Sequence, residues 1–285
     1  MIKKIVIAAH KPYAFAHDDL YLPLHVGAAG KKDILDLGTI YLKDGRAFGE
    51  TLMRDDIDEN ISEKNDRYCE LTALYWAWKN LKDAEVVGLV HYRRYFTEKS
   101  ALFRHGHDPL RCVLTDGELT ALLDQYDILV PRKRIYGIET LYSHYDHTLN
   151  GYELDAAGEI VREMYPEYGP LIEKVFHRRW GYMFNMAIWR REDLDDYCLW
   201  LFHILFALEK RLTDEGYMDT LSAFERRLYG RVSEILFNVW VEKKRQEGRR
   251  IGEVPLIHIE AEDWNKKVRG FLAAKFTGKK YKESF

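Results

Sequence analysis

The chain has 285 residues, of which 47% are hydrophobic and 31% charged, and its formal net charge at pH 7 is −3. This composition excludes global disorder, and the charge lacks the basic excess of a general nucleic-acid binder, so no nucleic-acid partner is expected. The 19 tyrosines and 7 tryptophans exceed what a core requires. Their rings suit sugars and nucleobases, because each combines an apolar face with a polar group.

The three cysteines are widely spaced and form neither a CxxC pair nor a disulfide framework, which favours a reducing compartment. The first residues lack the apolar region of a signal peptide, and no segment reaches the roughly 18 apolar residues of a membrane span. We therefore expect a cytoplasmic protein that is at most peripheral on the inner face of the cytoplasmic membrane.

Strands and helices alternate in the first part of the chain. Residues 3–9 predict a strand, and residues 34–38 predict a second short strand or sheet edge. An acidic loop over 55–65 precedes a helix over 69–81, in which apolar residues recur at helical spacing. The continuously apolar run 86–90 is typical of a parallel strand buried on both faces.

The later elements continue this alternation, which indicates an α/β fold. In chain order they are a helix (115–125), a strand (127–131), a loop-rich insert (132–158), two helices (159–165 and 170–178), a core strand (181–189), two long helices (193–211 and 231–247) and a last strand (254–259). Residues 1–262 are expected to form one domain, because no repeat or linker interrupts them. The basic, aromatic tail over 263–285 either lies on a membrane surface or is a solvated terminus.

The sequence YRR at residues 92–94 follows the apolar strand directly, after His91. In open α/β sheets ligands bind at the carboxyl ends of the strands, and guanidinium groups match phosphate oxygens. Arg93 and Arg94 therefore indicate a diphosphate ligand, or else they form ion pairs with carboxylates at the sheet edge.

Two further patterns carry residue types that bind metals. His144 and His147 have a spacing that one helical face could offer to a metal, or they could hydrogen-bond a sugar or phosphate. Asp55, Asp56 and Asp58 could hold Mg²⁺ or Mn²⁺ beside a diphosphate, or they could simply be solvated.

Three polar residues stand in otherwise apolar segments. Asn185 lies within the apolar run 181–189 and must hydrogen-bond a neighbouring loop or a ligand hydroxyl, because an unpaired buried amide costs about 1–3 kcal/mol. Glu70 and Glu234 each stand near the start of a predicted helix. A carboxylate there either interacts favourably with the helix dipole or acts as a general base.

Several long motifs resemble a family of bacterial glycosyltransferases from capsular and exopolysaccharide loci, long catalogued as a domain of unknown function. They cover most of residues 3–259 and read, in order, KIVIAAHKPY, DDLYLPLHVGA, ENISEKNDRYCELTALYWAWKN, VGLVHYRRYF, LYSHYDHT, MFNMAIWRREDLDDYCLWLF and SEILFNVW. The resemblance implies a GT-A-like (Rossmann-like) α/β fold, with a mostly parallel sheet flanked by helices and a helical C-terminal part. Some members are galactofuranosyltransferases. The resemblance thus implies transfer of a hexose, galactofuranose or galactose, from a UDP-sugar to a lipid-linked oligosaccharide.

The resemblance also suggests roles for individual residues. His144, His147 and Asn185 would face the sugar or acceptor. An inverting displacement needs a carboxylate to deprotonate the acceptor hydroxyl, and Glu234 and Asp146 are the candidates. The basic residues at the strand end stand where many GT-A enzymes carry a metal-binding Asp-x-Asp motif, so they could stabilise the leaving diphosphate without a metal. No metal is therefore expected to be required, with Mn²⁺ or Mg²⁺ as the alternative. The implied donor-binding residues are His10, Lys11, Asn60, Ser62, Lys64, Asn65, Glu70, His91, Arg93 and Arg94.

Two positions depart from the family pattern. Glu59 stands where Asp is more usual, and Ile235 stands where Ser-Glu is usually followed by Arg, with Arg231 as the substitute cation. Two other functions stay open. One is a non-catalytic sugar-binding or assembly module of a polysaccharide-synthesis complex. The other is a metal-dependent phosphotransferase or hydrolase built on the acidic loop and on His144 and His147.

Overall fold

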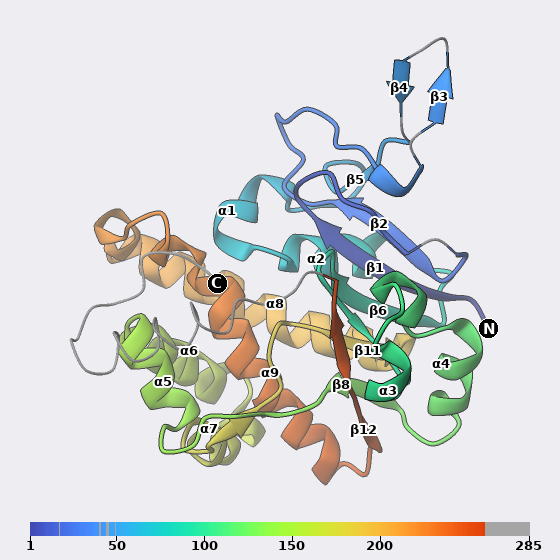
Figure 1. Cartoon of the computed structure of the whole chain (residues 1–285). Coiled ribbons are helices and arrows are strands. Elements are labelled where there is room, and N and C mark those ends of the chain that lie inside the picture. Colours follow the sequence, from blue (N-terminus) through green and yellow to red (C-terminus); the bar gives the residue numbers. More distant parts are fainter. Residues whose placement is uncertain (17, 40, 44–45, 49, 260–285) are drawn as a thin grey trace. The chain divides into compact units, whose positions relative to one another are not determined.

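The computed structural model describes residues 1–259 except 17, 40, 44, 45 and 49 (Figure 1). The chain divides into two compact units. The described part of the first unit comprises Met1–Arg132, Asn185–Cys198 and residues 249–259, and that of the second comprises Lys133–Phe184 and Leu199–Gly248. The predicted tail over 263–285 lies outside the described residues.

The first unit is built on a mostly parallel sheet. Its strands lie in the order β12-β8-β11-β6-β1-β2-β5, and β11 runs antiparallel to both of its neighbours while the other adjacent pairs are parallel. After β6 the chain turns back as β7 (Arg94–Phe96), which also pairs with β13 (Leu256–His258). The strands of the main order are β1 (Lys3–Ala9), β2 (Tyr21–His25), β5 (Met53–Arg54), β6 (Val86–His91), β8 (Ile128–Pro131), β11 (Ala187–Arg190) and β12 (Ile251–Val254).

The core of this sheet follows the apolar runs of the sequence. Ile5, Val6 and Ile7 in β1 are fully buried, as expected of a strand covered on both faces. Gly88 in β6 allows close packing, because a Cβ atom there would lie 2.9 Å from Cγ1 of Ile188 on the adjacent strand. The strands predicted at 3–9, 86–90 and 127–131 are thus confirmed.

The second strand of the sequence prediction is wrong. Leu35 and Asp36 make only isolated bridges, and a 3₁₀ turn, η1 (Leu37–Thr39), follows them. The strand beside β1 is β2, which contains Pro23. Proline is tolerated here because, among the described residues, β5 pairs with β2 only at Leu24 and His25, so the stretch that holds Pro23 has a paired strand on one side only.

Short helices accompany the sheet. α2 (Leu71–Asn80) packs against β1 and β6 and confirms the helix predicted at 69–81. α1 (Asn65–Tyr68) ends just before it, and Cys69, with a left-handed φ of 54°, separates the two. α4 (Asp116–Leu123) confirms the helix predicted at 115–125, with Thr115 and Glu118 forming a capping box. The other short elements of this unit are α3 (Ala101–Arg104), η2 (Ser62–Lys64), η3 (Pro109–Cys112) and the hairpin β3 (Tyr41–Lys43)–β4 (Arg46–Phe48).

The second unit is largely helical, so the loop-rich insert predicted at 132–158 is wrong. Two helices, α5 (Leu141–Thr148) and α6 (Gly151–Met164), lie there. The side chains of α5 are too polar and aromatic to show a clear apolar stripe, whereas the buried Leu154, Ala157 and Val161 of α6 do recur at helical spacing. The strand predicted at 181–189 is split, because Phe184 and Asn185 adopt left-handed φ angles of 78° and 51° between β10 and β11. The elements are β9 (Arg134–Ile135), α5 (Leu141–Thr148), α6 (Gly151–Met164), η4 (Pro166–Tyr168), α7 (Gly169–Phe176), β10 (Trp180–Gly181), η5 (Tyr217–Thr220), η6 (Glu225–Arg227) and α9 (Leu228–Gln246).

Two long helices complete the chain. α8 (Arg191–Asp214) contributes residues to both units and confirms the predicted helix at 193–211. α9 packs against α7 and α6 and runs through Gly230, where the sequence predicted a break. The burial of residues such as Trp240 along α9 outweighs the roughly 1 kcal/mol by which glycine weakens a helix. Among the described residues, no helix combines the length and the apolar character needed to cross a membrane.

Candidate functional site

The carboxyl ends of β1, β2, β5 and β6 share one edge of the sheet, because these strands run parallel to one another. This edge carries the residues that follow the strands, among them His10 after β1, Gly27 after β2, Asp55 after β5 and Tyr92 after β6. In α/β sheets such an edge is the usual place for a ligand.

Three basic side chains gather on the ring of Tyr92 at this edge. The ring centroid lies 5.2 Å from that of His10, 5.5 Å from Nζ of Lys11 and 5.2 Å from Cζ of Arg93. Tyr13 packs edge-on against the same ring at 5.2 Å. We call these five residues the Tyr92 cluster. Tyr92 itself is buried, whereas His10 and Lys11 are exposed, so the positive charge faces solvent.

The two arginines of the YRR motif separate in the structure. Arg93 lies in the turn after β6 and stacks on Tyr92. Arg94 begins β7, where its backbone pairs with His91 on one side and His258 on the other. His91 ends β6 and is half-buried, as is Arg94. Arg93 is therefore the member of the motif that joins the Tyr92 cluster.

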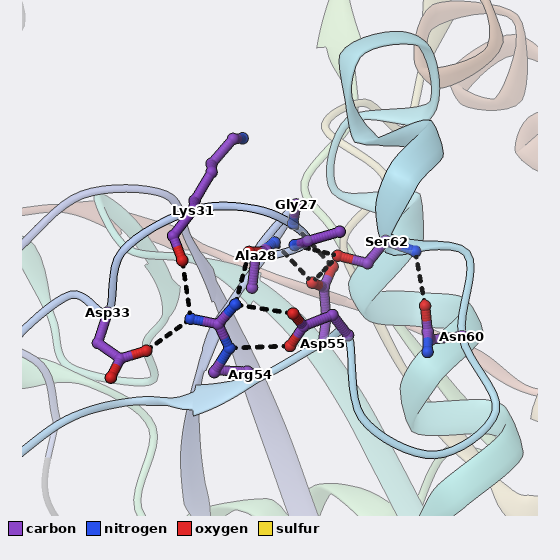
Figure 2. Close-up of polar contacts among 10 residues, drawn as sticks. Gly27, Ala28, Lys31, Asp33, Arg54, Asp55, Asn60 and Ser62 are labelled. Carbon is purple, nitrogen blue, oxygen red and sulfur yellow. Dashed lines mark hydrogen bonds and ion pairs between the residues drawn. The ribbon is translucent and has the colours of Figure 1, made fainter.

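The acidic loop after β5 is organised around Asp55, which is fully buried (Figure 2). Its carboxylate accepts hydrogen bonds from the backbone N–H groups of Gly27 at 2.8 Å and Ala28 at 3.0 Å, and from Oγ of Ser62 at 2.5 Å. This contact set ties the loop after β2 to the loop after β5. Asp55 is therefore not solvated, and its carboxylate is engaged by groups of the chain itself.

The next two carboxylates of this loop have different surroundings. Asp56 pairs with Arg54 at 2.7 Å, and this hydrogen-bonded guanidinium holds the pKa of the Asp56 carboxyl below its usual value. Asp58 is exposed and has a left-handed φ of 54°. Within the described part of the chain, no group of three or more His, Cys, Asp or Glu side chains is arranged to hold a metal ion.

The expected donor-loop residues make local contacts that shape the loop. Asn60 donates from Nδ2 to the carbonyl of Asp58 at 2.8 Å and accepts from the N–H of Ser62 at 3.1 Å. Asn65 donates to the carbonyl of Cys69 at 2.7 Å. Ser62, which the sequence predicted as a donor residue, is buried against Asp55 instead of facing solvent. A direct donor contact by any of them stays a prediction.

Lys64 and Glu70 complete that predicted set. Nζ of Lys64 lies 5.7 Å from the ring centroid of Tyr68. Oε1 of Glu70 accepts a hydrogen bond from Nδ2 of Asn185 at 2.6 Å. Asn185 is 5% exposed, so the buried amide has its partner within the protein, as one of the two sequence interpretations required.

The second unit holds a carboxylate between two histidines. His144 and His147 lie three residues apart on α5, and their Nδ1 atoms lie 2.7 Å and 3.1 Å from Oε2 and Oε1 of Glu139. We call these three residues the Glu139 cluster. The sequence prediction missed Glu139, although a carboxylate directly before the Thr140–Ser143 capping box was a usable signal, since it lies within reach of the first helical turns.

Burial and hydrogen bonding together set the protonation of His144 and Glu139. Burial lowers the pKa of His144, and the hydrogen bond and charge of Glu139 offset this only in part. Burial also acts to raise the pKa of Glu139, but the hydrogen bonds to His144 and His147 outweigh it and leave that pKa below its usual value. At neutral pH the cluster therefore combines an ionised carboxylate with a neutral His144.

The two predicted catalytic carboxylates lie elsewhere in this unit. Asp146 is exposed and its Oδ1 accepts the backbone N–H of Gly151 at 2.8 Å, at the turn into α6. Glu234 is half-buried and lies beyond the first turn of α9, so the helix-start interpretation of this residue is wrong. The guanidinium of Arg231, the proposed substitute cation, stacks on the ring of Phe224 at 3.9 Å.

A buried acid in α6 escaped the sequence prediction. Glu153 is 1% exposed and accepts hydrogen bonds from the hydroxyls of Tyr145 and Tyr217, the latter at 3.2 Å. Burial raises its pKa to about 7, against the opposing effect of the two tyrosine hydrogen bonds and of Arg231. No local pattern reveals this, because the tyrosines come from α5 and from η5, far apart in the sequence.

Comparison with known proteins identifies the family of the chain and a solved structure that it resembles. The chain matches a solved structure described as WbbM, a bifunctional glycosyltransferase in its apo form, with a TM-score of 0.77 and 31% sequence identity, over 93% of this chain and 46% of that chain. The chain thus spans less than half the length of that protein. The match confirms the expected α/β fold of GT-A type, with its mostly parallel sheet. No curated protein matches the chain. The family model described as a domain of unknown function, DUF4422, matches residues 4–246, and the chain therefore belongs to the DUF4422 family.

Proposed function

We propose that this protein is a glycosyltransferase that uses a UDP-sugar donor. The observation that carries the proposal is the Tyr92 cluster, in which an imidazole, an ammonium and a guanidinium surround one buried ring at the carboxyl edge of a parallel sheet. The family membership and the likeness to WbbM, which is described as a bifunctional glycosyltransferase, support it.

The chemistry of sugar transfer requires stabilisation of a departing diphosphate. When the bond between the anomeric carbon and the phosphate oxygen breaks, negative charge develops on UDP. Positive groups fixed in advance stabilise that charge more in the transition state than in the bound substrate. Lys11 and Arg93 supply such charges, and His10 adds a third when protonated. The rings of Tyr13 and Tyr92 can contact the nucleoside.

The finer assignment follows the family resemblance. We propose transfer of a hexose, galactofuranose or galactose, with inversion, to a lipid-linked oligosaccharide at the inner face of the cytoplasmic membrane in capsular or exopolysaccharide synthesis. His91 and Arg94 would support the diphosphate, and His144, His147 and Asn185 the sugar or acceptor. Glu234 and Asp146 are the carboxylate candidates for the base. Metal-independent transfer is proposed, with Mn²⁺ or Mg²⁺ as the alternative.

Calorimetric titration with UDP and with uridine tests the donor site. Arg93→Ala and Lys11→Ala should each weaken UDP binding about tenfold or more, because a charge-assisted hydrogen bond contributes about 1.5–3 kcal/mol, and should change uridine binding little. Arg111→Ala is the matched control, since Arg111 is an exposed arginine in η3. Equal losses for UDP and uridine, or no UDP binding by the unaltered protein, would overturn the proposal.

The same titration repeated with Mn²⁺ and after chelation tests metal dependence. UDP binding that is unchanged by chelation supports a diphosphate held by basic side chains. UDP binding that appears only with Mn²⁺ would leave the transferase proposal in place but would contradict the metal-independent mechanism.

A further inference from the structure

We propose that a surface patch of the second unit docks the protein on an anionic lipid bilayer. The patch lies at the short antiparallel ladder of β9 and β10 and at the turn that follows β9. This inference goes beyond the proposed transfer reaction, because binding to lipid needs neither donor nor acceptor. We call this surface the β9–β10 patch, and its residues are Lys133, Arg134, Ile135, Ile138, Arg179 and Trp180.

The patch exposes two large aliphatic side chains close together in the chain. Ile135 is 74% exposed and Ile138 is 72% exposed. The strand preference of a β-branched residue accounts for Ile135, which lies in β9. It does not account for Ile138, which lies in the turn where the N–H of Glu139 donates to the carbonyl of Tyr136 at 3.3 Å. Turn positions favour small and polar residues, so an isoleucine there is better explained by an apolar partner.

Basic side chains surround the two isoleucines. Lys133, Arg134 and Arg179 are exposed. The segments 133–138 and 177–180, which carry the patch, contain no Asp or Glu. The whole chain has a formal net charge of −3, so this positive charge is a local concentration. Cations beside exposed aliphatic groups complement anionic headgroups and the acyl chains beneath them.

The acidic side chains beside these segments are engaged within the protein. Glu139 is buried and contacts two imidazoles. Glu242 accepts hydrogen bonds from Lys174 at 2.5 Å and from Arg178 at 2.7 Å. Glu173 is exposed and accepts from a guanidinium of α6 at 2.7 Å. These carboxylates therefore leave the positive character of the patch in place.

Trp180 joins the cations to the apolar side chains. It is the ladder partner of Ile135, so the two side chains lie on one face. Its ring centroid lies 4.9 Å from Nζ of Lys133 and 4.1 Å from Cζ of Arg178. Tryptophan favours the boundary between water and hydrocarbon, because its ring is apolar and its N–H is polar. A lysine stem along such a ring can extend its ammonium to the headgroups.

Exposure alone does not identify a lipid-binding surface. Leu102 in α3 is 86% exposed, more than either isoleucine of the patch. Its segment 98–108, however, carries two acidic and two basic residues, and so lacks an excess of positive charge. Nucleic acid would match the cations of the β9–β10 patch but not its isoleucines, because phosphate contacts dominate such binding. An anionic bilayer matches both.

Co-sedimentation of the full chain with lipid vesicles tests the proposal. The protein should bind vesicles of phosphatidylglycerol and phosphatidylcholine, and should bind pure phosphatidylcholine much more weakly. Added salt should reduce the binding, because it screens the charges. Ile135→Asp/Ile138→Asp should lower the partition coefficient about tenfold or more, since two apolar side chains no longer enter the bilayer. Lys133→Gln/Arg134→Gln should lower it about fivefold for each basic residue removed.

Leu102→Asp is the matched control. It places the same carboxylate at a highly exposed aliphatic position outside the patch, and should leave the partition coefficient within about twofold. All the substituted side chains are exposed, so thermal unfolding should show that each variant is folded. An equal loss in Leu102→Asp would reveal a general effect of added negative charge and would overturn the patch.

Trp180 gives a second readout that a general electrostatic attraction would not produce. Lipids with brominated acyl chains quench only those tryptophans that approach the hydrocarbon. Quenching should accompany vesicle binding and should fall in Trp180→Phe, which retains an aromatic ring at the patch. Quenching that is the same in this variant would place another part of the chain at the bilayer and would refute the docking geometry.

The remaining outcomes separate this inference from the proposed function. Vesicle binding that is unchanged in both double variants would overturn the patch and would favour another segment, such as the predicted tail over 263–285. Absence of binding to anionic vesicles by the unaltered chain would overturn the inference as well. Neither result bears on the donor site, because the titrations with UDP contain no lipid.

Discussion

Asn185 donates a hydrogen bond to Glu70 at 2.6 Å, and this contact joins the segment before β11 to the start of α2 within the first unit. Asn185 occupies a left-handed backbone conformation, with a φ of 51°, which asparagine adopts more readily than most residues. The same residue therefore satisfies the backbone and a carboxylate 115 positions away in the sequence.

Replacement of this amide should show how strongly the pair couples. Asn185→Asp keeps the backbone preference but sets two carboxylates against each other, and should lower the free energy of unfolding by about 1–3 kcal/mol. Glu70→Gln in the same chain recreates an amide–carboxylate hydrogen bond with the roles reversed. The double variant should recover at least half of the loss, as measured by urea unfolding. Strictly additive effects would show that the two side chains do not couple.

The ring of Tyr92 should matter more to UDP binding than its hydroxyl. Tyr92→Phe keeps the face on which Lys11 and Arg93 lie and should leave the Kd for UDP within threefold. Tyr92→Leu removes it and should weaken binding about tenfold, since each cation–π contact contributes roughly 0.5–1 kcal/mol. Calorimetry measures the Kd for UDP of both variants, after thermal unfolding has verified that each is folded. Equal affinities for the two would contradict the role of the ring.

Gly27 should tolerate a methyl group much less well than Gly30. Both have left-handed φ angles, +60° and +70°, but a Cβ at Gly27 would lie 2.5 Å from Cγ of Asn65, whereas one at Gly30 meets nothing within 4 Å. Gly30→Ala should therefore lower the free energy of unfolding by about 1–2 kcal/mol through backbone strain alone. Gly27→Ala should lower it clearly more, because it adds a steric clash. Unfolding free energies of the two variants measure the difference. A Gly27→Ala protein as stable as Gly30→Ala would argue against the close packing of Asn65.

The buried acid Glu153 should make stability depend on pH. Burial raises its pKa to about 7 from 4.5, so the native state binds a proton that the unfolded chain has already released near neutral pH. The contribution of this proton to the free energy of unfolding is fully present below about pH 4.5 and is lost as pH rises through 7. The total loss is on the order of 3 kcal/mol. Glu153→Gln should remove this loss. Urea unfolding at pH 5, 6.5 and 8 should thus show a flatter profile for the variant, and parallel profiles would refute the assignment.

The sheet was readable from the sequence where strands are continuously apolar. Residues 3–9 and 86–90 were found for this reason, whereas β2 was missed because Pro23 argues against a strand unless one neighbour is absent. The break at Phe184 and Asn185 was hidden for the opposite reason. Both residues fit an apolar strand by composition, and only their left-handed backbone interrupts it.

The candidate site was readable where function depends on side chains that follow a strand. Arg93 was identified in this way, whereas His10 and Lys11 were implied by the family resemblance, and all three come together on Tyr92. Glu139 was not identified, because its contacts with His144 and His147 depend on α5, a helix that was not predicted. Pairings such as that of Glu70 with Asn185 require the tertiary fold, since no local pattern links residues so far apart.

Asp55 gives the loop after β2 a counter-ion of its own. Adjacent backbone N–H groups, such as those of Gly27 and Ala28, are a common means of holding a ligand's phosphate, but here a carboxylate of the chain occupies them. The main chain at this point is thus committed to structure, and the diphosphate contact proposed above is left to side chains such as Lys11. A protein organised in this way can acquire a different ligand through single substitutions at the sheet edge, while the loop beneath keeps its shape.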